Sequence, residues 1–146
     1  MENKRNYKRK RVRLFLYTDG AARGNPGPAG VGIIIKNERG EIIKKYYEYI
    51  GIKTNNQAEY EAILKGLSCI QRYRPDEVVC FLDSQLITNQ LLGLFKIKNS
   101  ELKKYFQKVK KQSRFFPKIS FFHIQREKNK EADQLANKAI DEQGVF

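Results

Sequence analysis

The chain has 146 residues, a length typical of one domain, and 40% of them are hydrophobic, which excludes an intrinsically disordered polymer. Its 29 lysines and arginines outnumber 16 aspartates and glutamates, and the resulting net charge of +13 indicates a polyanionic partner, with nucleic acid favoured over a membrane surface. No apolar stretch approaches the roughly 18 residues of a membrane span, and the two cysteines lie in apolar patterns rather than in a disulfide framework. We therefore expect a cytoplasmic protein, monomeric by default.

The first part of the chain predicts a tail and three strands. Residues 1–13 are a basic run without periodicity, which we interpret as a mobile tail that either grips phosphates or is simply solvated, in front of a single domain at 14–146. Apolar runs at 14–18 and 31–35, and residues 41–52 after the turn sequence NERG, predict a meander of three strands.

The remainder predicts helices and two further strands. Thr54 or Asn55 caps a helix that runs to about Tyr73. The continuously apolar EVVCFL at 77–82 predicts a buried parallel strand reached through a crossover. The pattern then predicts helices at 84–95 and 100–114, a strand at 118–125 and a helix at 129–143 ended by Gly144. The order βββαβααβα indicates an α/β fold with a five-stranded mixed sheet flanked by helices.

Four acidic residues occupy positions where a solubilising carboxylate is not expected. Asp19 follows the first strand and Asp83 the fourth, so these two would lie side by side if the strands are parallel neighbours. Glu59 and Asp133 fall on the apolar faces of their helices. Capping or turn formation explains each acid singly. Four carboxylates together, however, would repel and protonate unless cations were bound. Oxygen ligands suit Mg²⁺ or Mn²⁺, and two such ions form a clamp for phosphodiester displacement.

Four sequence blocks, in their order and spacing, resemble those of the type 1 ribonuclease H family. They are YTDGAARGNPGPAGVG (17–32), TNNQAEYEA (54–62), LDSQLITNQL (82–91) and HIQREKNKEADQLANKA (123–139). The resemblance implies a ribonuclease H-like fold with sheet order 3-2-1-4-5. It also implies endonucleolytic hydrolysis of the RNA strand of RNA/DNA hybrids, leaving 5′-phosphate and 3′-hydroxyl ends, with a role in removing RNA primers and R-loops.

The same resemblance implies roles for the four acids as metal-binding, catalytic residues. One ion, held by Asp19 and Asp83, would activate a water molecule. The other, held by Asp19, Glu59 and Asp133, would stabilise the leaving 3′-oxygen. Two ions per site, Mg²⁺ or Mn²⁺, are thus implied with substrate bound.

Substrate-binding positions are also implied. Contacts to bases and 2′-hydroxyls fall on Asn25, Asn55, Asn56 and Gln85. Thr54 matches the residue that holds a DNA-strand phosphate. Turn chemistry and helix capping explain the same residues if the resemblance is set aside.

The chain departs from many family members in two places. The loop before the last helix is short, QREKN, so that Arg126 replaces the usual loop histidine, while His123 falls within a strand pattern, which favours a structural strand residue over a catalyst. This combination resembles the archaeal-type and plant-domain branch. The tryptophan- and lysine-rich basic protrusion is absent, and its replacement is expected in a lysine-rich helix that includes Lys103, Lys104 and Lys108.

Two other functions compete with a hybrid-specific nuclease. A catalytically silent domain of the same fold would only hold hybrids or duplex RNA, and the presence of all four acids argues against it. A resolvase or transposase core would act on DNA, and the asparagine and glutamine set suited to 2′-hydroxyls argues against that. Whether duplex RNA is a second substrate stays open.

Overall fold

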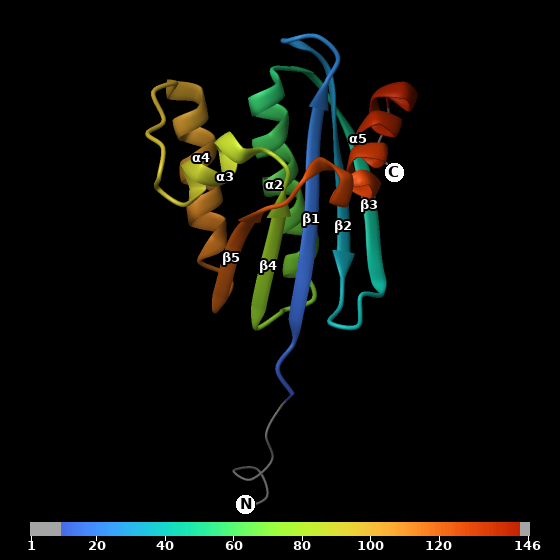
Figure 1. The fold of residues 1–146 in the computed structure, drawn as a ribbon, viewed down its shortest axis with the longest axis vertical. Coiled ribbons are helices and arrows are strands. Elements are labelled where there is room, and N and C mark those ends of the chain that lie inside the picture. The colour runs from blue at the N-terminus through green and yellow to red at the C-terminus, as the bar shows by residue number, and fades with distance from the viewer. Residues whose placement is uncertain (1–9, 144–146) are drawn as a thin grey trace, which may run out of the picture.

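The computed structural model describes residues 10–143, so most of the predicted basic tail lies outside the described residues (Figure 1). The strands are β1 (Arg13–Ala22), β2 (Gly27–Lys36), β3 (Ile42–Lys53), β4 (Glu77–Leu82) and β5 (Lys118–His123). The helices are α2 (Asn55–Gln71), α3 (Gln85–Leu91), α4 (Ser100–Ser113), the short 3₁₀ helix η1 (Arg126–Lys128) and α5 (Lys130–Glu142).

The strands form one mixed sheet in the order β3-β2-β1-β4-β5, which confirms the predicted α/β fold and strand order. β1, β2 and β3 pair antiparallel as a meander, whereas β4 runs parallel to both β1 and β5. The parallel strands require crossovers, and α2 and the α3–α4 pair supply them. β1 is therefore central.

The two faces of the sheet are covered differently. Alternate residues of β1, Leu14 and Leu16, point into the main apolar core, where side chains from α2, α3 and α4 pack. α5 lies on the opposite face, over β2 and β3 (Figure 1). Its close approach depends on Gly32, because a Cβ there would stand 2.0 Å from the backbone oxygen of Ala132.

Several predicted boundaries were wrong: β2 begins at Gly27 rather than at residue 31, and β5 ends at His123 rather than at residue 125. β1 extends four residues beyond Thr18, because its pairing with β2 continues to Ala22. α3 ends at Leu91 rather than residue 95, and Gly93 follows with a φ of +77°, which is incompatible with a continuing helix. α5 ends at Glu142, and Gln143 takes a left-handed conformation, while Gly144, which was predicted to end this helix, lies outside the described residues.

None of the helices within residues 10–143 has the length and apolar character needed to cross a membrane.

Candidate active site

Asp19 lies inside β1 rather than at its tip, where the sequence had placed it. Its partner across the β1–β2 ladder is Gly32. The parallel pairing of β1 with β4 ends two residues earlier, at Tyr17 and Phe81. Asp19 is thus held by strand pairing on one side and lies beside the open end of β4 on the other. Its side chain is only 5% exposed.

Glu59 reaches Asp19 from the first turns of α2. The backbone N–H of Gly20 donates a 2.7 Å hydrogen bond to Glu59 Oε1. A Cβ on Gly20 would stand 2.0 Å from the backbone oxygen of Ala58, so only glycine permits this approach of helix and strand. The glycine that follows Asp19 therefore positions the second carboxylate.

Asp83 comes directly after β4, and its orientation is set by a residue that the sequence reasoning missed. The side-chain amide of Asn129 donates to Asp83 Oδ2 and to the backbone oxygen of Thr18, both at 2.9 Å. Asn129 is 2% exposed, and its Oδ1 has no hydrogen-bond partner among the described residues. The helix-capping role considered for Asp83 belongs instead to Ser84, whose side chain accepts from the N–H of Ile87.

Asp133 lies in the first turn of α5, as its predicted helical position required. Its backbone oxygen and Oδ1 accept hydrogen bonds of 3.0 and 3.3 Å from the Asn137 amide, one turn later. Because α5 packs closely on β2, this turn lies next to the middle of β1.

The acids are close enough to perturb one another. Carboxylate oxygens of Asp19, Glu59 and Asp83 lie within 4.8 Å of one another, while Asp133 lies outside this tight group. Burial raises the pKa of Asp19 well above its usual value, and the charges of Glu59 and Asp83 raise it further. Burial also raises the pKa of Glu59, against the hydrogen bond from Gly20 that lowers it. The fold thus places these carboxyl groups where their ionised form is electrostatically unfavourable.

An open cavity of about 430 Å³ contains all four acids, which confirms that they converge. Other residues predicted to contact substrate or assist turnover line it as well, namely Asn55, Asn56 and Arg126. The four acids offer only carboxylate oxygens. Hard oxygen donors of this kind are the ligands that Mg²⁺ and Mn²⁺ prefer. The buried triad of Asp19, Glu59 and Asp83 is therefore able to bind a metal ion.

Asn25 and Thr54 lie outside that cavity lining and make structural contacts. Asn25 Oδ1 accepts from the N–H of Asn55, and Asn55 Oδ1 accepts from the N–H of Ala22, so the β1–β2 turn and the start of α2 are hydrogen-bonded together. Thr54 caps α2 through a reciprocal pair of hydrogen bonds with Gln57. These contacts fix the position of the α2 N-terminus relative to the acids.

The remaining predicted substrate contacts are exposed residues beside the site rather than in it. Gln85 is the first residue of α3, just after Asp83 and Ser84. Lys103, Lys104 and Lys108 lie on α4, whose first turn contacts α2 through a 2.6 Å hydrogen bond from Gln57 to Glu101. Only eight residues separate α3 from α4, in agreement with the missing protrusion.

The short loop before α5 folds as η1 and brings Arg126 to the acids. Arg126 lines the cavity, and its charge lowers the pKa of Glu59. His123 belongs to β5, as predicted, but is its last residue. Its side chain is exposed and is not among those that line the cavity.

Known proteins are similar to this chain in sequence and in fold. The family described as "Reverse transcriptase-like" matches residues 17–139. Ribonuclease HI of Halobacterium salinarum is 37% identical over 130 residues, which is 89% of this chain and 65% of that protein. The chain thus spans about two thirds of that relative, and 36% of the Mycobacterium tuberculosis proteins that it matches at 32% identity.

Two further relatives are covered nearly in full. Ribonuclease H of Coxiella burnetii is 30% identical, with 88% of this chain and 90% of that protein covered. LC11-RNase H1, a protein isolated from compost and solved in complex with an RNA/DNA hybrid, is 43% identical, with a TM-score of 0.85 over 89% of this chain and 98% of that one. The crystal structure of the Halobacterium enzyme gives a TM-score of 0.87, with 89% and 98% covered. The chain belongs to the reverse transcriptase-like family and, within it, to the type 1 ribonucleases H.

Proposed function

We propose that the chain is a divalent-ion-dependent endonuclease that hydrolyses the RNA strand of RNA/DNA hybrids. The observation that carries the proposal is the packing of one carboxylate oxygen each from the buried Asp19, from Glu59 and from Asp83 within 4.8 Å of one another. Such an arrangement favours protonation in a free protein and becomes favourable only with cations bound. The hybrid bound by LC11-RNase H1 supports the choice of substrate.

The acids would divide between two Mg²⁺ or Mn²⁺ ions. Asp19 and Asp83 would hold one, and Asp19, Glu59 and Asp133 the other. Bound there, the ions supply an activated water and neutralise charge on the leaving 3′-oxygen, so that 5′-phosphate and 3′-hydroxyl ends result. The protein's own contribution is to fix these ligands in advance: Gly20 holds Glu59, and Asn129 holds Asp83.

The surroundings of the acids suit a hybrid. Asn55 and Asn56 line the same cavity, where their amides would meet groove edges and 2′-hydroxyls. Asn25 supports Asn55 from the β1–β2 turn, and Gln85 extends the polar surface past Asp83. The DNA strand would rest near Thr54 and the lysines of α4. We further propose that residues 14–146 act as one domain in a cytoplasmic monomer that removes RNA primers and R-loops.

A cleavage assay with three substrates tests the proposal. We expect a labelled RNA/DNA hybrid to be cut with Mg²⁺ or Mn²⁺ and left intact with excess chelator. Duplex DNA of the same sequence serves as the control and is expected to stay uncut. Cleavage of duplex RNA would widen the substrate range, whereas cleavage of duplex DNA, or hybrid cleavage that persists in chelator, would contradict the proposal.

Replacing Asn129 with alanine is expected to lower the cleavage rate by about 10- to 100-fold, because Asp83 loses the donor that orients it. The readout is kcat together with the apparent affinity for Mn²⁺, and both are expected to weaken. Asn37→Ala is the matched control, since its amide likewise donates to a carboxylate, that of Glu41, but in the exposed β2–β3 turn away from the four acids. Equal effects of the two substitutions would contradict a special role for Asn129.

Arg126→Ala is expected to slow turnover about 3- to 10-fold, because one cation is removed from the wall of the cavity. His123→Ala is expected to leave both turnover and the melting temperature nearly unchanged, since its side chain is exposed and outside the cavity lining. Steady-state kinetics on the hybrid separate the two. A larger loss in the histidine variant would reverse the assignment.

A further inference from the structure

Aromatic side chains line up across three strands on the face of the sheet opposite the main core. In the parallel ladders, Tyr17 is opposite Phe81, and Phe81 is opposite Phe122, so the three share one face. Phe15 precedes Tyr17 by two residues and therefore lies on the same face. We call these four residues the aromatic face.

The rings contact one another in a continuous layer. Ring centroids of Tyr17 and Phe81 are 4.9 Å apart at an interplanar angle of 28°. Phe81 lies 6.2 Å from Phe15, nearly parallel at 11°, and 6.2 Å from Phe122 at 33°. Phe81 is thus the centre of a ring cluster that spans β1, β4 and β5, stacked with Phe15 and Tyr17 and tilted against Phe122.

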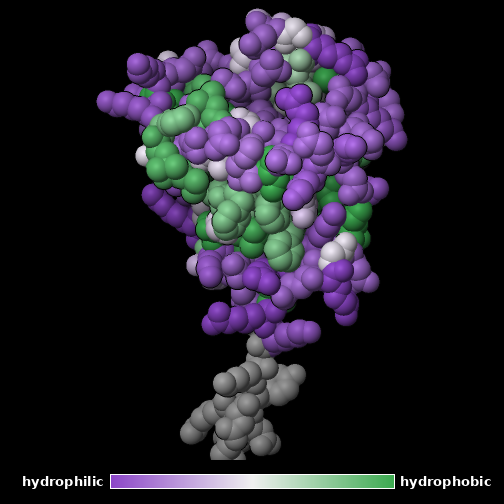
Figure 2. All heavy atoms as spheres, viewed as in Figure 1, coloured by the Kyte–Doolittle hydropathy of each residue, from purple (hydrophilic) through white to green (hydrophobic). Residues whose placement is uncertain are grey.

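This layer is open to solvent. α2, α3 and α4 cover the other face, and α5 covers β2 and β3 (Figure 1). Figure 2, from the same side, shows an apolar patch over the region of β1, β4 and β5. Phe122 is 51% exposed, and the other three rings are partly exposed. Contiguous exposed apolar surface of this kind marks interaction sites in soluble proteins.

Cations surround the rings. The Arg13 guanidinium lies 5.4 Å from the Phe15 ring centroid, and Lys36 Nζ lies 4.9 Å from that of Tyr17. Both also pair with acids, Arg13 with Glu38 and Lys36 with Glu131. The edge of the face is therefore charged but partly neutralised.

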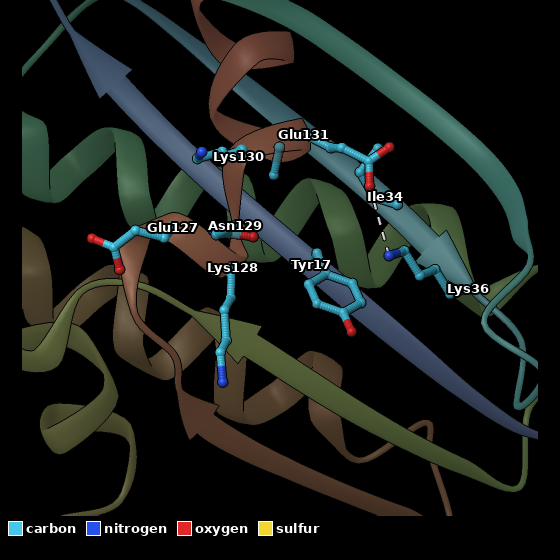
Figure 3. Close-up of a pocket in the computed structure, with 9 residues that line it drawn as sticks. Tyr17, Ile34, Lys36, Glu127, Lys128, Asn129, Lys130 and Glu131 are labelled. Atoms are coloured by element: carbon cyan, nitrogen blue, oxygen red, sulfur yellow. Dashed lines mark ion pairs between the residues drawn. The ribbon is translucent and has the colours of Figure 1, made fainter.

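Lysines without acidic partners among the described residues line a small pocket between Tyr17 and the start of α5. The pocket has a volume of about 130 Å³. Figure 3 shows the Lys128 side chain extending from η1 on the same side of β1 as Tyr17. Lys128 and Lys130 both line it, and neither forms an ion pair with a residue in the range 10–143. Glu127 is the acid on this wall that likewise has no ion-pair partner in that range.

We propose that the aromatic face binds single-stranded nucleic acid, separately from the carboxylate cavity. Flat rings presented on a sheet are surfaces on which unpaired bases stack, and lysines beside them hold the backbone phosphates. A duplex hides the faces of its bases, so single strands are selected. Phe122 and Phe81 would stack on bases, and Lys128 would contact phosphate.

The position of the face relative to the acids supports this occupant. Asp19 follows Tyr17 by two residues on the same side of β1, and Asp83 follows Phe81 by two residues at the end of β4. The aromatic face therefore lies on the same side of β1 as Asp19, and η1 and the start of α5 contribute residues both to the carboxylate cavity and to the small pocket beside Tyr17. A single-stranded overhang of a substrate duplex would lie within reach of it.

Fluorescence anisotropy of a labelled 12-nucleotide single-stranded DNA, measured in chelator, tests the proposal. Phe122→Ala is expected to weaken binding by about 5- to 100-fold, which is the range for loss of one stacked base. Phe122→Tyr keeps the ring and is expected to restore binding. Phe115→Ala is the matched control, since Phe115 is 66% exposed at the α4–β5 junction and is expected to have no effect. Melting temperatures exclude unfolding as the cause.

Photocrosslinking locates the bound strand. Oligonucleotide carrying 5-bromouracil is expected to crosslink to the peptides that contain Tyr17, Phe81 and Phe122. Crosslinks confined to the carboxylate cavity, equal binding by Phe122→Ala and the unsubstituted chain, or a dimer that dissociates in Phe122→Ala would each overturn the proposal. Cleavage of a blunt-ended hybrid by the unsubstituted chain is scored independently, so failure here leaves the proposed nuclease activity standing.

Discussion

Asp19→Asn is expected to reduce ion-dependent cleavage of an RNA/DNA hybrid on the order of 10³-fold or more, measured as kcat with saturating Mg²⁺. Asp19 is the most buried of the four acids and the one whose pKa the others raise most strongly. Asparagine keeps the shape of the side chain but removes the charge that would serve both ions. The loss is therefore expected in kcat rather than in substrate binding.

Hybrid binding supplies the internal control for this variant. The groove residues Asn55 and Asn56 are unchanged, so the Kd for hybrid in the absence of divalent ions is expected to stay within about threefold of the unsubstituted value. Asp141→Asn is the matched surface control, because Asp141 pairs with Arg23 at the exposed end of α5. Normal turnover in Asp19→Asn would remove this residue from the mechanism.

Without divalent ions, the stability of the folded chain is expected to fall as pH rises from about 5 to 8. The pKa values of Asp19 and Glu59 are raised by folding from ordinary values of 3.8 and 4.5. Over this range the unfolded chain has released these protons and the folded chain still holds part of them. Raising the pH therefore favours unfolding, by up to about 1.4 kcal/mol per pH unit for each retained proton.

Thermal unfolding in chelator at a series of pH values measures this effect. Asp19→Asn is expected to flatten the dependence and to raise the free energy of unfolding near pH 8, on the order of 1–3 kcal/mol. Saturating Mg²⁺ or Mn²⁺ is expected to reverse the loss in the unsubstituted chain, because the ions bind the ionised acids. A metal-free chain that gains stability over this range would show that the acids are not electrostatically frustrated.

The strand order and the convergence of the acids were predictable because local patterns determine them. The continuous apolar run at β4 indicated a buried parallel strand, and helical spacing placed Glu59 and Asp133 on apolar faces. Crossover rules then leave few ways to arrange five strands. The position of Asp19 and Asp83 just beyond the paired part of β1 and β4, and of two acids on inward helix faces, follows from that topology.

What could not be predicted depends on long-range contacts. The extension of β1 through Asp19 results from pairing with β2, which the run of small residues after Thr18 concealed. Asn129 resembles an ordinary helix cap, and its bond to Asp83 joins residues 46 positions apart. The aromatic face is likewise invisible in sequence, because Tyr17, Phe81 and Phe122 become neighbours only through register. For Asn129, the one available signal was its position directly before an amphipathic helix with acids in its first turn.

Anomalous diffraction from crystals of the chain grown with Mn²⁺ and an uncleavable hybrid tests the central claim most directly. The account predicts manganese peaks about 2.2 Å from carboxylate oxygens of Asp19, with Glu59, Asp83 and Asp133 as the other protein ligands. Manganese bound only elsewhere, or a hybrid seated away from these acids, would contradict it.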